Sequence, residues 1–159
     1  MKEIYFLSED ECKFFEALCE TIVPEGPDPA TDPGALTIGA ISYIDSLLYD
    51  LPKNSQQHFR EAIKLLDKDC KNKFSKNFAA IKPEQRDSAL RDFYFNSKTR
   101  EMMFDLRSLV LEGFYSDYRD PSYSGVTAWE YIEFGGKRIS DIKKDWSFLK
   151  AWKDHTDGR

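Results

Sequence analysis

Residues 98–115 read KTREMMFDLRSLVLEGFY, the most apolar helical pattern in a chain of 159 residues. Apolar side chains recur at intervals of three and four residues and cover a broad arc of the predicted helix. They are Met102, Met103, Leu106, Leu109, Val110 and Phe114. Because a helix that is apolar over a wide arc is covered on several sides, we expect this helix to be central to the fold.

The first helix is predicted to begin after Ser8, which forms with Glu11 the capping-box pattern S-x-x-E. The inward face of this helix, at helical spacing, is Cys12, Phe15, Leu18, Cys19 and Ile22. Pro24 ends the helix, and the segment PEGPDPATDPG that begins there is predicted to be a loop.

Further helices are predicted over residues 37–51, after Ser55, and from Pro83, because a proline in the first helical turn loses no hydrogen bond. The inward face of the helix from Pro83 is Leu90, Phe93 and Tyr94. No run of alternating β-branched residues appears. The sequence therefore predicts an all-α fold, a single-domain bundle of five or six helices with a long aromatic loop near the C-terminus.

The domain is predicted to span residues 1–136, with a short helical piece, TAWEYIEF, after Gly125. Residues 137–159 form a basic C-terminal tail that we expect to be partly helical, around Trp146, Leu149 and Trp152. A solvated helix face and a site for an anionic partner both fit the charges of this tail.

The composition is that of a soluble globular protein, with 41% hydrophobic and 32% charged residues. The net charge of −5 does not point to nucleic acid or to an anionic membrane as a general partner. No segment has the length of apolar chain that a membrane span needs. The start, MKEIYFLSEDE, lacks the pattern of a signal peptide, so the residues alone predict a cytoplasmic protein.

The three cysteines, Cys12, Cys19 and Cys70, include no C-x-x-C pair and are expected to be buried free thiols. A disulfide from Cys12 or Cys19 to Cys70 across a helix pair stays open as an alternative. The two histidines, His58 and His155, show no metal-ligand spacing, so no metal site is predicted.

Motifs of catalytic and cofactor sites are missing from the sequence. It has no G-x-G-x-x-G, no G-x-x-x-x-G-K-[ST], no G-x-S-x-G and no H-E-x-x-H. Carboxylates gather around the aromatic segment 109–136, LVLEGFYSDYRDPSYSGVTAWEYIEFGG, and two of them could do acid–base work. They are Glu112, Asp117, Asp120, Glu130 and Glu133. We favour structural roles for them, in turns and in solvated positions, and expect no catalytic residue and no cofactor in this chain.

Four groups of residues, in order along residues 6–136, carry a resemblance to a known family. The patterns are L-S-E-x-E…L-x-E-T-I-V-P, then P-G-A…Y-I-D, then F-A-A-I-K-P-E-Q, then L-E-G-F-Y-S-D…D-P-x-Y-x-G…W-E-Y-I-x-F-G-G. The residues concerned are Leu18, Ile22, Pro24, Gly34, Ile44, Asp45, Phe78, Ile81, Glu84, Gln85, Leu111, Glu112, Gly113, Phe114, Tyr115, Asp117, Tyr123, Gly125, Trp129 and Gly135. In this order the sequence resembles subunit 3, the gamma or small subunit, of gluconate 2-dehydrogenase-type enzymes.

The resemblance implies a function. Such subunits pair with a large flavoprotein of the glucose–methanol–choline oxidoreductase type, which oxidises a sugar, a sugar acid or a glycoside on FAD. A cytochrome often accepts the electrons. The small subunit helps the large one mature and cross the membrane, so the resemblance implies a periplasmic complex. This chain lacks the twin-arginine signal common in the family, and it has Tyr123-Ser124-Gly125-Val126 where the family usually reads Y-G-G-N.

The aromatic segment is then expected to be a partner interface, because aromatic side chains with polar edges are the composition of binding hot spots. The expected interface residues are Glu112, Phe114, Tyr115, Tyr118, Tyr123 and Trp129. Glu112 is expected to accept backbone N–H groups of the returning loop, and Gly113 to let the aromatic turn pack close to the helix. The alternative is that these aromatic side chains close the end of the bundle, and both can hold.

We expect a non-catalytic accessory subunit. The first alternative is a stand-alone helical adaptor or chaperone without an oxidoreductase partner. A second alternative is a small lyase or isomerase that uses the acidic loop.

Overall fold

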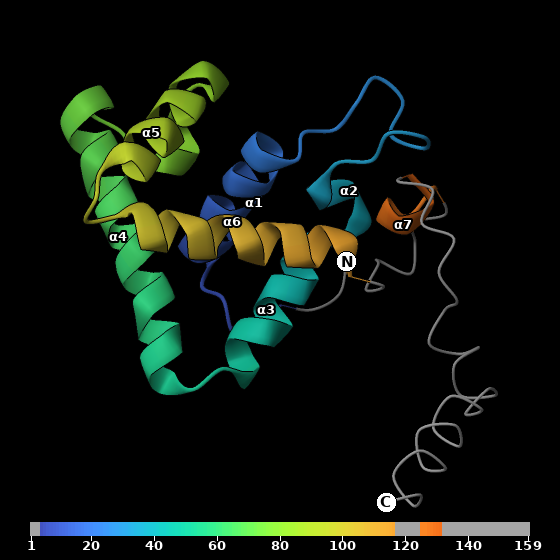
Figure 1. The fold of residues 1–159 in the computed structure, drawn as a ribbon, viewed down its shortest axis with the longest axis horizontal. Helices are drawn as coiled ribbons and strands as arrows, with labels where there is room; N and C mark the ends of the chain where they lie inside the picture. Colours follow the sequence, from blue (N-terminus) through green and yellow to red (C-terminus); the bar gives the residue numbers. More distant parts are fainter. Residues whose placement is uncertain (1–3, 117–124, 132–159) are drawn as a thin grey trace, which may run out of the picture.

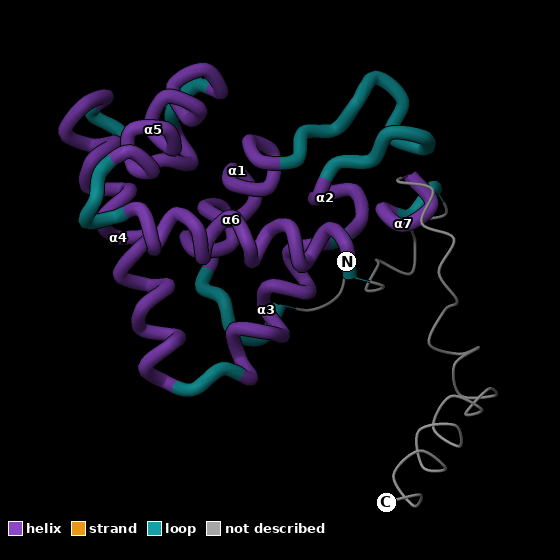
Figure 2. Tube along the Cα trace, viewed as in Figure 1, coloured by secondary structure: helices purple, strands orange, loops and turns teal. Residues whose placement is uncertain are grey.

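The structure, a computed structural model, describes residues 4–116 and 125–131. Its elements are α1 (Glu9–Ile22), α2 (Ala35–Ile38), α3 (Ala40–Asp50), α4 (Lys53–Phe74), the 3-10 turn η1 (Phe78–Ala80), α5 (Pro83–Phe95), α6 (Arg100–Tyr115) and α7 (Ala128–Tyr131). The described part of the chain contains helices and loops and no strand (Figure 2). The predicted all-α bundle is confirmed.

Helix α6 is the centre of the bundle, as its sequence predicted. It contacts α1, α2, α3, α4, α5 and α7, and the other helices surround it on several sides (Figure 1). Leu106, Leu109 and Val110 on its inner side are buried. The short helix α7 contacts α6 and lies at its C-terminal end (Figure 1).

Helix α1 begins as predicted. The Ser8 side chain accepts a hydrogen bond from the Glu11 N–H at 3.3 Å, and the Glu11 carboxylate accepts one from the Ser8 N–H at 2.9 Å. Burial raises the pKa of Glu11, but hydrogen bonds from Ser8 and Arg60 outweigh burial and hold this pKa below its ordinary value. The helix buries Phe14 in addition to the predicted face, and Cys12 and Ile22 are half-buried.

The predicted helix 37–51 is wrong in one respect, because the structure divides it. Helix α2 ends and α3 begins at Gly39, whose φ of 97° lies in the left-handed region that favours glycine. The hydrophobic stripe continues across this break, with Ile38 before it and Ile44 after it both buried. Periodicity alone therefore did not reveal the turn.

Helix α5 starts at Pro83, as predicted, and its buried side includes Leu90 and Phe93. Tyr94, which was predicted to face inward, is instead 40% exposed. The turn η1 before α5 is held by Asp67 of α4, whose carboxylate accepts the Phe78 N–H at 2.9 Å.

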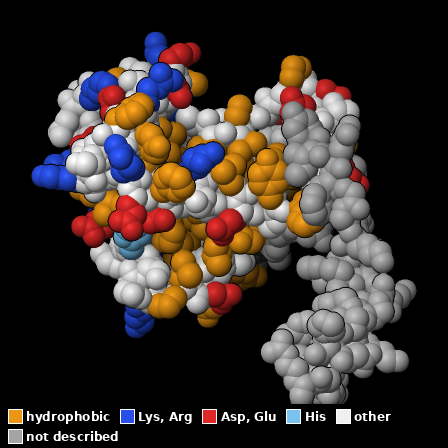
Figure 3. All heavy atoms as spheres, viewed as in Figure 1, with side chains coloured by type: hydrophobic (Ala, Val, Ile, Leu, Met, Phe, Trp, Pro, Cys, Tyr) orange, Lys and Arg blue, Asp and Glu red, His pale blue; other side chains and the backbone are white. Residues whose placement is uncertain are grey.

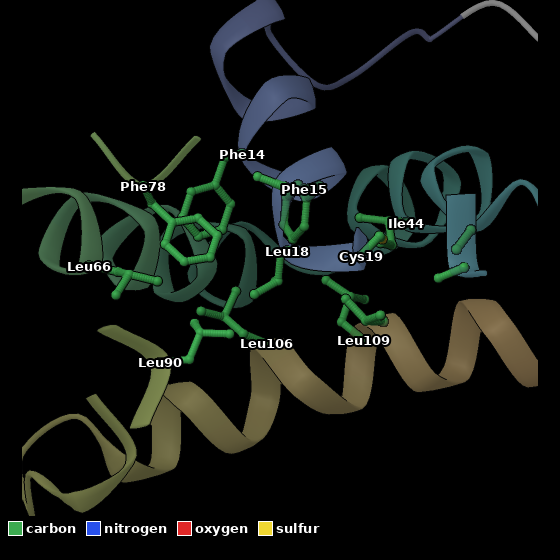
Figure 4. Packing of buried hydrophobic residues seen from close by; sticks show 14 of the residues in the cluster. Phe14, Phe15, Leu18, Cys19, Ile44, Leu66, Phe78, Leu90, Leu106 and Leu109 are labelled. Carbon is green, nitrogen blue, oxygen red and sulfur yellow. The ribbon is translucent and has the colours of Figure 1, made fainter. Parts of the chain in front are cut away.

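The core lies where α1, α3 and α4 meet α6. Figure 4 shows Leu18 of α1 pointing toward Leu106 of α6. Phe14 packs against Phe78, with ring centroids 5.3 Å apart. Of the three cysteines, Cys19 and Cys70 are buried in this core and Cys12 is half-buried, and all three are free thiols. Burial was therefore predicted correctly for Cys19 and Cys70, and no disulfide forms.

Asp45 is a buried carboxylate, with 3% of its surface exposed. Its two oxygens accept the backbone N–H groups of Tyr5, Phe6 and Leu7 at 2.8–3.0 Å. A carboxylate that accepts three N–H groups is satisfied although it is buried. Asp45 thus attaches the segment before α1 to α3.

Candidate functional site

The last turn of α6 is built on a close approach between two helices. A Cβ at Gly113 would lie 3.0 Å from the Cβ of Ala40 and 3.3 Å from its backbone oxygen. The absent side chain therefore lets α6 pack against the start of α3. The aromatic turn that Gly113 was expected to let pack close to the helix lies in residues 117–124, outside the described residues, so that expectation stays a prediction.

Glu112 lies beside this crossing, on the exposed side of α6. The Tyr43 hydroxyl of α3 donates a hydrogen bond to Glu112 Oε2 at 3.5 Å. Burial raises the pKa of the Tyr43 hydroxyl, and the neighbouring Glu112 carboxylate raises it further. The tyrosine therefore remains a proton donor to this carboxylate at neutral pH. The loop amides that Glu112 was expected to bind lie in residues 117–124, outside the described residues.

Helix α7 is attached to the end of α6. The Trp129 indole N–H donates to the backbone carbonyl of Tyr115. Thr127 and Glu130 form a reciprocal cap, in which the Glu130 carboxylate accepts the Thr127 N–H at 2.8 Å and Thr127 Oγ1 accepts the Glu130 N–H at 3.2 Å. Glu130, one of the five carboxylates considered for acid–base work, thus caps a helix.

A second attachment joins this segment to the loop between α1 and α2. The Val126 N–H donates to the carbonyl of Ala30 at 3.0 Å. Ala128 at the start of α7 is buried. The segment 125–131 is therefore part of the folded domain.

The structure brings together three of the six predicted interface residues. Glu112 and Tyr115 lie one turn apart on the outer side of α6, and Trp129 contacts Tyr115. Tyr115 is 41% and Trp129 38% exposed. Phe114 points the other way and is a core residue, so its side chain offers no surface to a partner.

The remaining predicted positions are not described. Tyr118 and Tyr123 lie outside the described residues, as do Asp117, Asp120 and Glu133 and the basic tail. The interface prediction for these tyrosines stays a prediction.

An open cavity of about 690 Å³ lies between α3, α4 and α6, and Glu112 is one of its lining residues. Its walls are partly apolar, with Leu47, Phe59 and Leu109 among them. Its polar groups include Glu112 and the hydrogen-bonded side chains of His58 and Asp105.

The His58–Asp105 pair was not found from the sequence. His58 Nε2 lies 2.8 Å from Asp105 Oδ2, although 47 positions separate the two residues in the chain. Their side chains are 37% and 44% exposed. A histidine next to a carboxylate can hold and transfer a proton. In the part of the chain that the structure describes, however, His58 makes no hydrogen bond to a serine that it could activate.

The described residues contain no candidate metal site. There, no three side chains of His, Cys, Asp or Glu come together as a cation site. Among residues 4–116 and 125–131, no helix combines the length and the apolar character that crossing a membrane requires.

The described residues form a small helical protein. Aromatic and charged side chains lie together on an open surface along its central helix. The chain belongs to the family named gluconate 2-dehydrogenase subunit 3, whose model matches residues 9–136. The resemblance noted in the sequence is thereby confirmed. The family name describes a subunit of a multi-subunit dehydrogenase. No curated protein and no solved structure matches the chain.

Proposed function

We propose that this chain is a non-catalytic small subunit that binds, stabilises and helps to mature a large FAD-dependent dehydrogenase subunit of the glucose–methanol–choline type. The observation that carries the proposal is the family match over residues 9–136. In this proposal the large chain holds FAD and oxidises a sugar, a sugar acid or a glycoside. A cytochrome receives the electrons, and the complex works in the periplasm.

The surface chemistry supports a binding role. Tyr115 and Trp129 expose rigid aromatic area next to the carboxylate of Glu112. Aromatic side chains are enriched at protein interfaces and in their hot spots. The sequence supports the assignment of FAD to the partner, because it carries no dinucleotide-binding glycine motif.

Purification from the native cells through a small affinity tag on this chain tests the proposal. We expect a yellow complex in near-equal amounts with a much larger chain, a flavin absorption band, and dehydrogenase activity on sugars. Mass spectrometry of the large chain and the fractionation of the complex with periplasmic markers complete the experiment. A parallel purification from cells without the tag is the control. A colourless chain that elutes alone would contradict the proposal and favour the stand-alone adaptor.

A further inference from the structure

The central helix α6 exposes an apolar stripe on its outer side. Phe104 is 52% exposed and Tyr115 41% exposed, and Leu111 between them is half-buried. Intervals of seven and four residues place these three side chains along one line of a helix. Ser108 lies between Phe104 and Leu111 on this line, and Leu111 and Tyr115 are one turn apart. Apolar side chains that gather along one side of a helix are typical of an interaction site.

Charged residues of α6 are sorted to the two sides of this stripe. At 100° per residue, Arg100 and Arg107 fall on the side that faces α5. Glu101, Asp105 and Glu112 fall on the opposite side, toward α4 and α3. Figure 3 shows hydrophobic side chains across the middle of this face, with carboxylates and the histidine below them and both basic and acidic side chains above them.

Each charged side borders a groove. The basic side borders a groove of about 380 Å³ between α5 and α6, whose lining includes Tyr94, Phe104, Arg107 and the ion pair of Arg91 with Asp87. Tyr94 was predicted to face inward, but it is exposed and lines this groove.

The acidic side of the stripe borders the cavity of about 690 Å³ that contains His58, Asp105 and Glu112. The stripe is thus a ridge between a groove that contains the cation of Arg107 and a cavity that contains the carboxylates of Asp105 and Glu112.

Resting on the proposed function, we propose that this ridge with its two grooves, here called the α6 face, is the surface that binds the large flavoprotein chain. The α6 face is Tyr94, Phe104, Asp105, Arg107, Leu111, Glu112 and Tyr115. The complementary surface of the large chain is apolar at its centre, with carboxylates opposite α5 and cations opposite α4.

The charges on the two sides of the ridge indicate which charges the partner surface carries opposite them. Arg107 is exposed and makes no ion pair within the described part of the chain, so its charge is available to a carboxylate of the partner. Charges of opposite sign on the two sides of an apolar ridge admit one orientation of the partner and oppose the reversed one. Apolar contact along the ridge supplies affinity, and the charges supply orientation.

Two charge reversals test the α6 face in the complex of this chain with the flavoprotein chain that co-purifies with it. Arg107→Glu changes the basic side, and Glu112→Lys changes the acidic side. Each variant is expected to bind the large chain at least about tenfold more weakly, which corresponds to about 1.4 kcal/mol. Lys64→Glu is the matched control, because Lys64 is exposed on α4 and lines neither groove, so its reversal is expected to leave binding unchanged.

Thermal unfolding of each isolated variant separates lost binding from lost folding, and all three variants are expected to melt as the wild type does. If Arg107→Glu and Glu112→Lys bind as well as Lys64→Glu, the α6 face is overturned while the proposed function stands. If the wild-type chain retains no flavoprotein, the proposed function fails, and the assignment of the face fails with it. If the wild-type chain forms a homodimer that Arg107→Glu dissociates, the occupant is a second copy and the flavoprotein assignment is overturned.

Discussion

Asp45 shows how much of this fold depends on one side chain. It is buried and accepts three backbone N–H groups, from Tyr5, Phe6 and Leu7. In Asp45→Asn one acceptor oxygen becomes an NH₂ group that faces a donor, and at least one buried N–H loses its partner. We expect the free energy of unfolding to fall by about 1–3 kcal/mol, measured with urea. Asp50→Asn, at an exposed position of the same helix, should change it little, and equal effects would contradict this account.

The buried thiols predict a pH dependence. Burial raises the pKa of Cys19 to about 12 and that of Cys70 to about 11, from an ordinary value of 9.0. As pH rises above about 9, the unfolded chain therefore loses these protons before the folded chain does, and stability falls through the range up to about 11–12. The slope of unfolding free energy against pH should become shallower in Cys19→Ala/Cys70→Ala. An unchanged slope would show that these thiols do not contribute.

At the scale of elements, the crossing of α6 and α3 depends on Gly113. Alanine is the better helix former by about 1 kcal/mol. Its Cβ, however, would meet the Cβ and backbone of Ala40 at 3.0–3.3 Å, and overpacking costs about 1–3 kcal/mol. Gly113→Ala should therefore lower the free energy of unfolding. The double variant Gly113→Ala/Ala40→Gly removes the contact between the two Cβ atoms and should show a favourable coupling in a double-mutant cycle. A stabilised single variant would refute the close approach.

Element boundaries show what local patterns reveal. The capping box at Ser8 and the proline at the start of α5 act within one helical turn, and both helices begin where these signals predicted. The break at Gly39 was missed because the apolar stripe runs through it. A glycine inside a helical pattern was the available signal, and its positive φ appears only in the folded chain.

At the scale of the whole molecule, the two sides of α6 differ in burial, and we expect them to differ in role. Leu106 is fully buried among the other helices, whereas Leu111 is half-buried on the outer stripe. Leu106→Ala should lower the free energy of unfolding by about 2–5 kcal/mol. Leu111→Ala should cost less than half as much stability and instead weaken binding of the flavoprotein chain. Similar stability losses in the two variants would contradict this division of α6.

The sequence by itself determined the all-α class, most helix starts, the central place of α6 and the family. Helix class and helix starts follow from periodicity and capping residues, which act over a few neighbouring residues. The family follows from motifs whose order can be read in the sequence itself. Only the tertiary structure decided that Phe114 is core while Tyr115 is surface, that Asp45 binds the segment before α1, and that His58 meets Asp105. Each of these depends on how helices distant in the sequence pack together, since packing alone decides which side of an apolar helix is left exposed.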